Sequence, residues 1–461
     1  MNNSQIGYLQ KIVGRQNMCK TKEELLVYEY DATLLKGAPE VIIFPETTRQ
    51  VSEILAFSYQ EGIPVNTRGA GTNLSGGTIP DQGGIALVMT KMNKILEMNL
   101  SDQYVVVEPG VINQELQDLL LPYGYYYPPD PASMKACTIG GNIGECSGGP
   151  RCLKYGVTRD YVLGMEIVLS TGEIVEVGSK DQVYNEDLEI CKLMTGSEGT
   201  LGVFTKIYLK IKKMPEASKT MLCTFNGVKD ASKTVANIVS AGIVPTTLEL
   251  MDNLLINCAE DFTGLGLDRE AAALLLIEVD GFKEELDRQA LVIQQICERN
   301  KVKEFKIAQS RTEVDRLWTA RRTVIGAVAR KRPSYSLQDV TVPRNKLPDI
   351  VEEIVSISEE YQLPIGVLAH AGDGNLHPLV LFDERDEEEV KKVHEAEYKI
   401  CKAALALGGT LSGEHGIGLL KRPFLAQEFS PEVLKLKKQI MLAFDPQNIL
   451  NPDKILEVGK Q

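Results

Sequence analysis

Three glycine-rich segments constrain the fold of this chain more than any other feature: residues 68–77 (RGAGTNLSGG), 138–149 and 196–202. Glycine permits positive φ and lets backbone N–H groups approach a ligand closely, and successive N–H groups form a concave site for phosphate. No Gly-x-Gly-x-x-Gly joins a strand to a helix in the first segment, and no Gly-Lys-Ser/Thr follows any of them. They are therefore either ordinary turns, which glycine content alone favours, or a pyrophosphate site unlike the Rossmann and P-loop types.

The hydrophobic pattern predicts an α+β protein in which the spacing of strands and helices changes near Met214. Before it we predict strands at 41–44, 63–67, 85–89 and 104–107, helices near 50–60 and 113–121, a loop at 122–154, a hairpin at 164–177 and a strand at 203–213. After it we predict strands at 221–225, 246–249 and 274–279 and helices near 228–241 and 283–299. The longer helices between these later strands indicate a second domain.

Composition excludes several classes of function. The 461 residues carry a net charge of −13, whereas nucleic-acid binding needs a basic surface. No apolar run reaches the roughly 18 residues of a membrane span, and the N-terminus lacks a signal-peptide pattern. The nine cysteines include no Cys-x-x-Cys, so we expect free thiols in a reducing compartment, the cytoplasm.

Five motifs in order resemble the vanillyl-alcohol-oxidase-type (PCMH) FAD-binding family, and within it the group of glycolate oxidase catalytic subunits and flavin-dependent D-lactate dehydrogenases. The motifs are residues 68–77, 128–133 (PPDPAS), 137–142 (CTIGGN), 154–156 (KYG) and 196–202 (GSEGTLG). The resemblance implies a two-lobed FAD-binding domain at 41–214 after a helical lead-in at 1–40. It also implies an α+β substrate domain with an antiparallel sheet at 215–440, and a C-terminal segment at 441–461 that returns to the flavin domain.

The resemblance also implies which residues bind FAD. They are Arg68, Gly69, Gly71, Thr72, Asn73, Leu74, Ser75, Pro129, Ser133, Gly140, Gly141, Asn142, Gly144, Glu198, Gly199, Val203 and Asn451. Some relatives attach the flavin to a histidine of the first loop, but no histidine precedes residue 370. We also expect no link through Cys137, so the FAD is expected to be non-covalent.

Three of the four histidines lie in two glycine-flanked motifs, HAGDGNLH (370–377) and SGEHGIG (412–418), which we predict to be loops. Imidazoles and a carboxylate together form a common metal-binding set. The resemblance makes His370, His377 and Glu414 ligands of one divalent metal, with zinc, iron(II) and manganese all open, and His415 the catalytic base. His394 lies in a charged helix and is expected to be a surface residue.

In relatives, the counterpart of Arg321 pairs with the substrate carboxylate, for which a guanidinium is well suited. Relatives acting on 2-hydroxyglutarate carry an Asn directly after the second metal-binding His, whereas Pro378-Leu379 stand here. This difference favours a small 2-hydroxy acid, D-lactate first and glycolate second, over a dicarboxylate.

No NAD, haem or iron–sulfur motif is evident in the sequence, so the electrons are expected to pass to a protein partner. By analogy with relatives, this is an electron-transfer flavoprotein or an iron–sulfur subunit. Three other functions remain open: a D-2-hydroxyglutarate dehydrogenase, a non-redox transferase like alkyl-dihydroxyacetone-phosphate synthase, and a metal hydrolase without flavin.

Overall fold

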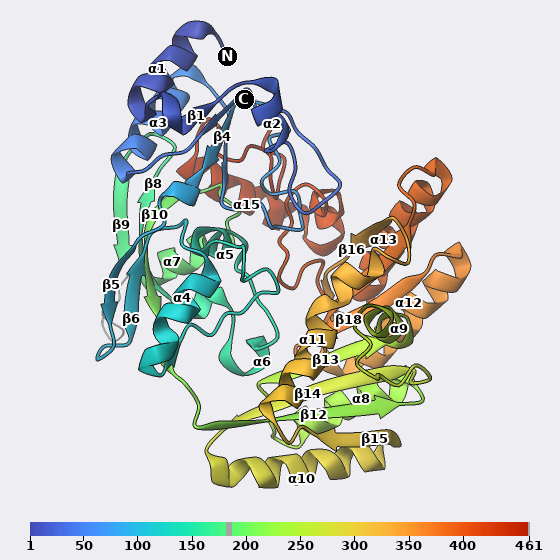
Figure 1. Ribbon diagram of the computed structural model, residues 1–461. Helices are drawn as coiled ribbons and strands as arrows, with labels where there is room; N and C mark the ends of the chain where they lie inside the picture. Colours follow the sequence, from blue (N-terminus) through green and yellow to red (C-terminus); the bar gives the residue numbers. More distant parts are fainter. Residues whose placement is uncertain (181–186, 460–461) are drawn as a thin grey trace. The chain divides into compact units, whose positions relative to one another are not determined.

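The computed structural model describes residues 1–180 and 187–459. Contacts between residues divide the chain into two compact units (Figure 1). The first comprises Met1–Gly148, Val157–Met214 and Glu414–Gln461, and the second comprises Gly149–Gly156 and Pro215–Gly413. The C-terminal return thus begins at Glu414 rather than at 441, because residues 419 and 420 are hydrogen-bonded to Ser75 in the first unit.

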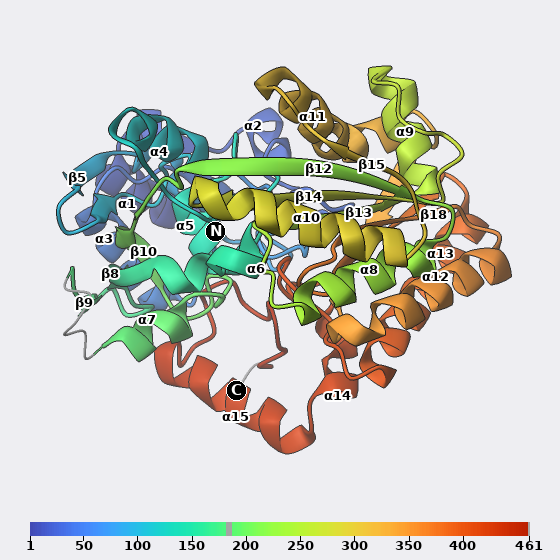
Figure 2. The same cartoon turned by 90° about the horizontal axis from the view of Figure 1, so that it is seen from below.

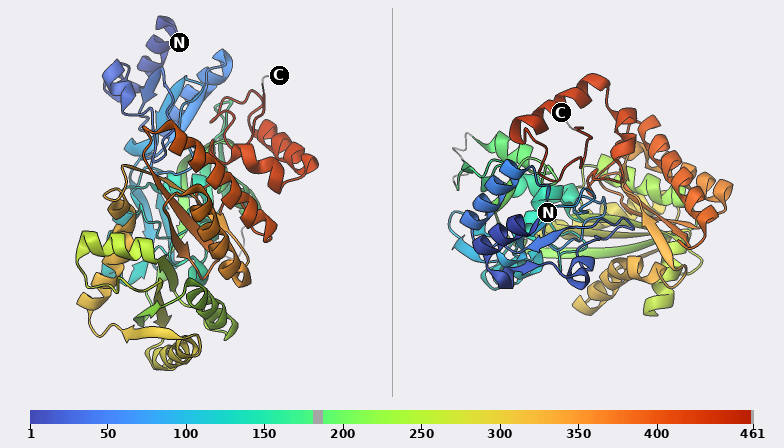
Figure 3. Two further views of the ribbon diagram at one scale, coloured as in Figure 1. Left: turned by 90° about the vertical axis from the view of Figure 1, so that its right-hand side faces the viewer. Right: turned by 90° about the horizontal axis from the view of Figure 1, so that it is seen from above.

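The first unit contains a small sheet with the order β1-β2-β4-β3, in which β2, β4 and β3 are parallel. Its strands are β1 (Met18–Cys19), β2 (Val41–Ile43), β3 (Val65–Arg68) and β4 (Ile85–Val88). Helix α3 (Thr48–Glu61) connects β2 to β3; Thr47 caps its start and Gly62, with φ of +63°, ends it. The Val65 N–H donates to the Ile449 carbonyl at 2.7 Å, so the C-terminal segment, red in Figure 3, extends this sheet.

The N-terminal segment was predicted to be helical, which is only partly correct. It contains α1 (Asn3–Val13) and α2 (Lys22–Leu26), but β1 lies between them and pairs with β2. Met18 lies opposite Ile43 in this pairing, so the segment contributes a strand to the sheet as well as helices.

A second, antiparallel sheet in the first unit has the order β5-β6-β10-β8-β9. Its strands are β5 (Ile95–Asn99), β6 (Tyr104–Val107), β8 (Val162–Val168), β9 (Ile174–Gly178) and β10 (Val203–Lys210). The predicted hairpin at 164–177 is confirmed as β8 and β9. Helices α4 (Asn113–Leu120), α5 (Ile139–Glu145) and α7 (Leu188–Met194) contribute buried side chains to the same core as these strands.

The prediction of one loop over residues 122–154 is wrong. This stretch contains β7 (Tyr125–Tyr126), which pairs with β11 (Lys212–Lys213), as well as α5 and α6 (Cys152–Tyr155). Helix α5 forms despite its glycines because Thr138 caps it and because Ile139 and Ile143, four residues apart, are both buried. The helix was not predicted from the sequence because glycine has a low helix propensity.

The second unit is built on an eight-stranded antiparallel sheet. Strands β15-β12-β14-β13-β18-β19-β16 follow one another, and β17 also pairs with β19. Their bounds are β12 (Ala217–Phe225), β13 (Thr247–Asp252), β14 (Ala273–Gly281), β15 (Val302–Ile307), β16 (Ser334–Leu337), β17 (Val340–Thr341), β18 (Ile365–His370) and β19 (Asn375–Phe382).

Helices cover both faces of this sheet (Figure 2). One face carries α9 (Asn253–Thr263) and α11 (Arg311–Val328), and the other carries α8 (Val228–Ser240), α10 (Lys283–Arg299), α12 (Leu347–Tyr361) and α13 (Glu387–Ala406). The first unit ends with α14 (Leu425–Glu428) and α15 (Pro431–Phe444). No helix in the described part of the chain has the length and apolarity that a membrane crossing requires.

Candidate functional site

A pocket in the first unit has a lining rich in glycine. It encloses about 530 Å³ not filled by atoms, part of it open to solvent, and seven of its 18 lining residues are glycines. Nine of the expected FAD-binding residues line it: Arg68, Gly69, Gly140, Gly141, Gly144, Glu198, Gly199, Val203 and Asn451. The three glycine-rich segments therefore meet at one cavity, as a shared binding site requires.

The other expected FAD residues are not in the lining of this pocket; all of them lie in loops except Asn142, which lies in α5. They are Gly71, Thr72, Asn73, Leu74, Ser75, Pro129, Ser133 and Asn142. Several hold the loops in shape: the Pro129 carbonyl accepts a hydrogen bond from Asn113 Nδ2 at 3.2 Å, and the Ser133 carbonyl accepts from the Cys137 N–H at 2.9 Å. Their contribution to FAD binding stays a prediction.

Two glycines of the pocket lie where neighbouring protein atoms leave no space for a side chain. A Cβ on Gly140 would lie 2.5 Å from Pro109 Cβ, and one on Gly199, where φ is +74°, would lie 2.8 Å from Asn451 Nδ2. Asn451 is itself fixed, since its Nδ2 donates to the Glu198 carbonyl at 2.9 Å.

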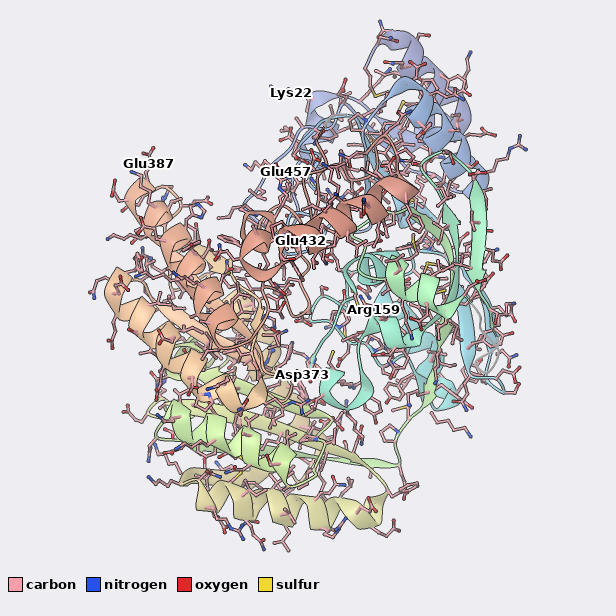
Figure 4. All side chains as sticks on the ribbon, turned by 180° about the vertical axis from the view of Figure 1, so that it is seen from behind. Lys22, Arg159, Asp373, Glu387, Glu432 and Glu457 are labelled. Carbon is pink, nitrogen blue, oxygen red and sulfur yellow. The ribbon has the colours of Figure 1, made fainter. Side chains whose placement is uncertain are left out.

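Arg159, labelled in Figure 4, donates to the Thr195 carbonyl at 2.9 Å and holds the start of the third glycine-rich segment. A cradle of exposed backbone fits the pyrophosphate of FAD.

Two acidic side chains lie in the wall of this pocket, although FAD is an anion. Burial raises the pKa of Glu198 to about 7, against the opposing effect of hydrogen bonds from the N–H groups of Ile417 and Gly418. Burial and the neighbouring Glu198 raise the pKa of Glu145 well above its usual value. Proton uptake by Glu145 reduces the negative charge that faces the cofactor, while Glu198 keeps both oxygens as acceptors of N–H groups.

His370 and His377 form a pair in the sheet of the second unit. The prediction that they lie on loops is wrong: His370 ends β18 and His377 lies in β19, and the turn between these strands holds Asp373 (Figure 4). The turn is tight because Gly374 adopts a φ of +78°. His370 pairs with Asn375 and Leu368 with His377, which makes the histidines diagonal neighbours. Their ring centroids are 5.0 Å apart, and they are 7% and 4% exposed.

Glu249, on β13, joins His370 to Arg321. Its Oε1 lies 2.7 Å from His370 Nδ1, and its Oε2 accepts from Arg321 Nε at 2.6 Å. Glu249 is 1% exposed. Desolvation disfavours its charge, but Arg321 and His370 outweigh this and hold the pKa of Glu249 below its usual value. The structure thus brings Arg321 and His370 into one buried ionic network.

Asp339 lies on the other side of the histidine pair. Its Oδ1 is 3.9 Å from His377 Nδ1. Its Oδ2 accepts hydrogen bonds from Ser412 Oγ at 2.7 Å and from the Gly413 N–H at 3.0 Å. The start of the second histidine motif is therefore held in the same unit as His370 and His377.

Glu414 and His415 follow Gly413 directly and begin the segment that belongs to the first unit. His415 Nε2 lies 3.8 Å from Glu414 Oε1. His394 lies on α13 with its side chain 72% exposed, 3.4 Å from Glu397, in agreement with the expected surface position.

Sequence comparisons match two stretches of the chain to known families. Residues 39–178 match the family described as "FAD binding domain", and residues 214–455 match "FAD linked oxidases, C-terminal domain". The chain is 41% identical over 446 residues to "Glycolate oxidase subunit GlcD" of Bacillus subtilis (strain 168), covering 96% of this chain and 95% of that one. It belongs to the FAD-linked oxidase family. It is also 33% identical to "D-lactate dehydrogenase" of Anaerostipes hadrus, covering 94% and 92% of the two chains.

Two solved structures share the fold. A substrate-bound p-cresol methylhydroxylase covers 100% of this chain and 98% of its own with a TM-score of 0.81 at 16% identity. An alkyldihydroxyacetonephosphate synthase covers 98% and 85% with a TM-score of 0.74 at 18% identity. These structures confirm the predicted PCMH-type α+β fold, and the family matches confirm the family and the FAD cofactor.

Several residues of these sites were not predicted from the sequence. In the pocket they are Thr67, Gly77, Thr78, Met89, Pro109, Thr138, Glu145, Gly202 and Phe204. Gly77, Thr138, Glu145 and Gly202 belong to the glycine-rich segments, so the segments were the available signal. Glu249 was also missed; an acid within the apolar strand TLELM is an unusual pattern that signals a buried partner.

Proposed function

We propose that this FAD-linked oxidase oxidises a small 2-hydroxy acid, D-lactate or glycolate, to the corresponding 2-oxo acid. The observation that carries the proposal is the Glu249 network, because it holds an imidazole and a guanidinium together in a buried site. Relatives named for glycolate oxidase and D-lactate dehydrogenase activity support the substrate class. A 2-hydroxy acid has a hydroxyl and a carboxylate for which these groups are suitable partners.

We propose His370, His377 and Glu414 as ligands of one divalent metal. A metal-binding histidine typically has its second ring nitrogen held by a carboxylate, which fixes the ring orientation. Glu249 holds Nδ1 of His370 in this way, which directs Nε2 away from Glu249. Glu414 follows Gly413, whose N–H is bonded to Asp339 beside His377. The donor set of two imidazoles and a carboxylate suits zinc, iron(II) or manganese.

Arg321 is proposed to bind the substrate carboxylate. Its Nε and Nη2 face Glu249, and the described residues supply no hydrogen-bond acceptor for Nη1. Guanidinium N–H groups are suitable donors to a carboxylate. Beside His377, Pro378 is buried and Leu379 lies in the apolar core with Leu368, so this position offers no polar side chain to a second carboxylate.

His415 is proposed to accept the hydroxyl proton of the substrate. FAD, when bound, would supply the hydride acceptor, and a metal held by His370, His377 and Glu414 would lower the pKa of the substrate hydroxyl. A neutral imidazole within hydrogen-bond reach is a suitable base. Electrons are then proposed to pass to an electron-transfer flavoprotein or an iron–sulfur subunit, in keeping with relatives named as subunits of glycolate oxidase.

The substrate class is tested by anaerobic titration of the purified yellow protein with D-lactate, L-lactate, glycolate and 2-hydroxyglutarate. We expect D-lactate or glycolate to bleach the flavin at the lowest concentrations and 2-hydroxyglutarate to act poorly. The proposal fails if none of the hydroxy acids bleaches a flavin that dithionite reduces normally. Preferential bleaching by 2-hydroxyglutarate would instead make the chain a dehydrogenase of the dicarboxylate.

A further inference from the structure

The carboxyl groups of Glu145 and Glu198 lie close together in the wall of the FAD pocket. A Cβ built on Gly77 would lie 3.1 Å from Glu145 Oε1 and 3.5 Å from Glu198 Oε2. A Cβ on Gly416 would overlap Glu145 Oε2 and lie 2.9 Å from Glu198 Oε1. Both carboxyl groups therefore lie between Gly77 of the first glycine-rich segment and Gly416, which directly follows His415.

Glu198 makes a specific connection to the segment after His415. Its Oε1 accepts a hydrogen bond from the Ile417 N–H and its Oε2 one from the Gly418 N–H, both at 2.7 Å. Glu198 is 5% exposed and has a φ of +51°, which is rare outside glycine. Residues held in this conformation often serve a functional site.

The same segment is held from a second side by Ser75. The Ser75 carbonyl accepts from the N–H groups of Leu419 and Leu420 at 2.9 and 3.1 Å. A Cβ on Gly418 would lie 2.2 Å from that carbonyl oxygen, so the two backbones are in close approach. Residues 417–420 are thus hydrogen-bonded to the first and third glycine-rich segments at four consecutive N–H groups.

We propose that Glu198 is a positioning residue that ties the segment after His415 to the FAD pocket and so fixes His415 as the base. This inference rests on the proposed function. It gives the Glu198 side chain a positioning role, whereas the family resemblance implies that Glu198 binds FAD. The two carboxylate oxygens are both needed because each accepts one N–H. A glutamine at this position has one acceptor oxygen, and its NH₂ group would face the second N–H.

The test compares Glu198→Gln with Glu145→Gln in the FAD-loaded protein. Both variants remove a carboxyl group from the same wall, but among the described residues the N–H groups of residues 417–420 donate to Glu198 and Ser75 and not to Glu145. Hydrogen exchange of residues 415–420 is expected to rise about tenfold in Glu198→Gln, the factor for losing a charge-assisted hydrogen bond. It is expected to stay unchanged in Glu145→Gln.

Activity gives the second readout. In Glu198→Gln we expect kcat to fall roughly 10- to 100-fold through misplacement of the base. We expect KM and the FAD dissociation constant to change less than about threefold, since Arg321 is the proposed partner of the substrate carboxylate and the glycine backbone is the proposed partner of the pyrophosphate. Glu198→Asp keeps the charge but is one CH₂ shorter, so it should show the same increase in exchange. This second variant is used if the first does not fold.

Two results would overturn the positioning role. In the first, Glu198→Gln loses FAD, and the fraction of the variant that still binds FAD shows unchanged hydrogen exchange at residues 415–420. This result would make Glu198 a cofactor ligand. The other is unchanged exchange together with unchanged kcat. If the wild-type protein oxidises no 2-hydroxy acid, the proposed function fails, but the exchange measurement still decides whether Glu198 ties down the segment.

Discussion

Replacing His370 or His377 by alanine is expected to remove the bound metal and to slow flavin reduction by substrate about a thousandfold or more. The reason is that a metal at the substrate hydroxyl supplies several kcal/mol of stabilisation, and each 1.4 kcal/mol, roughly, is a factor of ten in rate. FAD should stay bound because its pocket is formed by residues of the other unit. Metal content by elemental analysis and anaerobic flavin reduction measure the two effects.

His394→Ala is the matched control, since His394 is a histidine on the exposed face of α13. It should change neither metal content nor rate. The fluorescence of Trp318, the one tryptophan of the chain, reports whether the second unit is folded, because Trp318 lies in that unit's core. A folded His370→Ala protein that retains metal and full activity would contradict the proposed ligand set.

Replacing Glu249 by alanine is expected to destabilise the second unit by about 3–5 kcal/mol, as when one partner of a buried ion pair is removed. Arg321 would be left 7% exposed without its carboxylate. Glu249→Gln keeps the size of the side chain and should destabilise less. It should still weaken metal binding or activity about 10- to 100-fold, because the orientation of His370 would be less well fixed. Denaturant unfolding followed by Trp318 fluorescence measures the stability.

Glu278→Gln provides the comparison for Glu249. Glu278 is on the neighbouring strand β14 and accepts hydrogen bonds from Trp318 Nε1 at 3.2 Å and Thr220 Oγ1 at 2.9 Å, both neutral donors. A glutamine oxygen can accept these bonds, so we expect a change below about 1 kcal/mol. Equal effects of the two Gln substitutions would show that charge pairing at Glu249 is unimportant.

The sequence predicted much of the fold because local signals agreed with it. The helix at 283–299 and the strand at 104–107 have the bounds expected from their hydrophobic patterns. The errors occurred where tertiary contacts overrode local propensity. Helix α5 is rich in glycine, yet it is stabilised by a Thr138 cap and buried isoleucines. The two histidines beside glycines lie in strands because Gly374 makes a tight turn between them.

The sequence predicted which residue types form the site, but it did not predict which of these side chains contact one another. Motif order identified the glycine loops, and nine of the expected residues line the pocket. Glu249 lies 72 residues from Arg321 and 121 from His370 in the sequence. Pairing of β13 with β18 brings Glu249 opposite His370, and sequence spacing alone carries no information on such a partner. The same holds for Glu198 and the segment at 417–420, which are 219 residues apart or more.

The most direct test of the account is anaerobic flavin reduction by D-lactate in one preparation before chelation, after chelation and after metal is restored. We predict that D-lactate bleaches the flavin of the untreated protein. After chelation, bleaching should be at least about a hundredfold slower while FAD stays bound, and zinc, iron(II) or manganese should restore it. Bleaching at an unchanged rate in the chelated, metal-free protein would contradict a metal-assisted oxidation of 2-hydroxy acids.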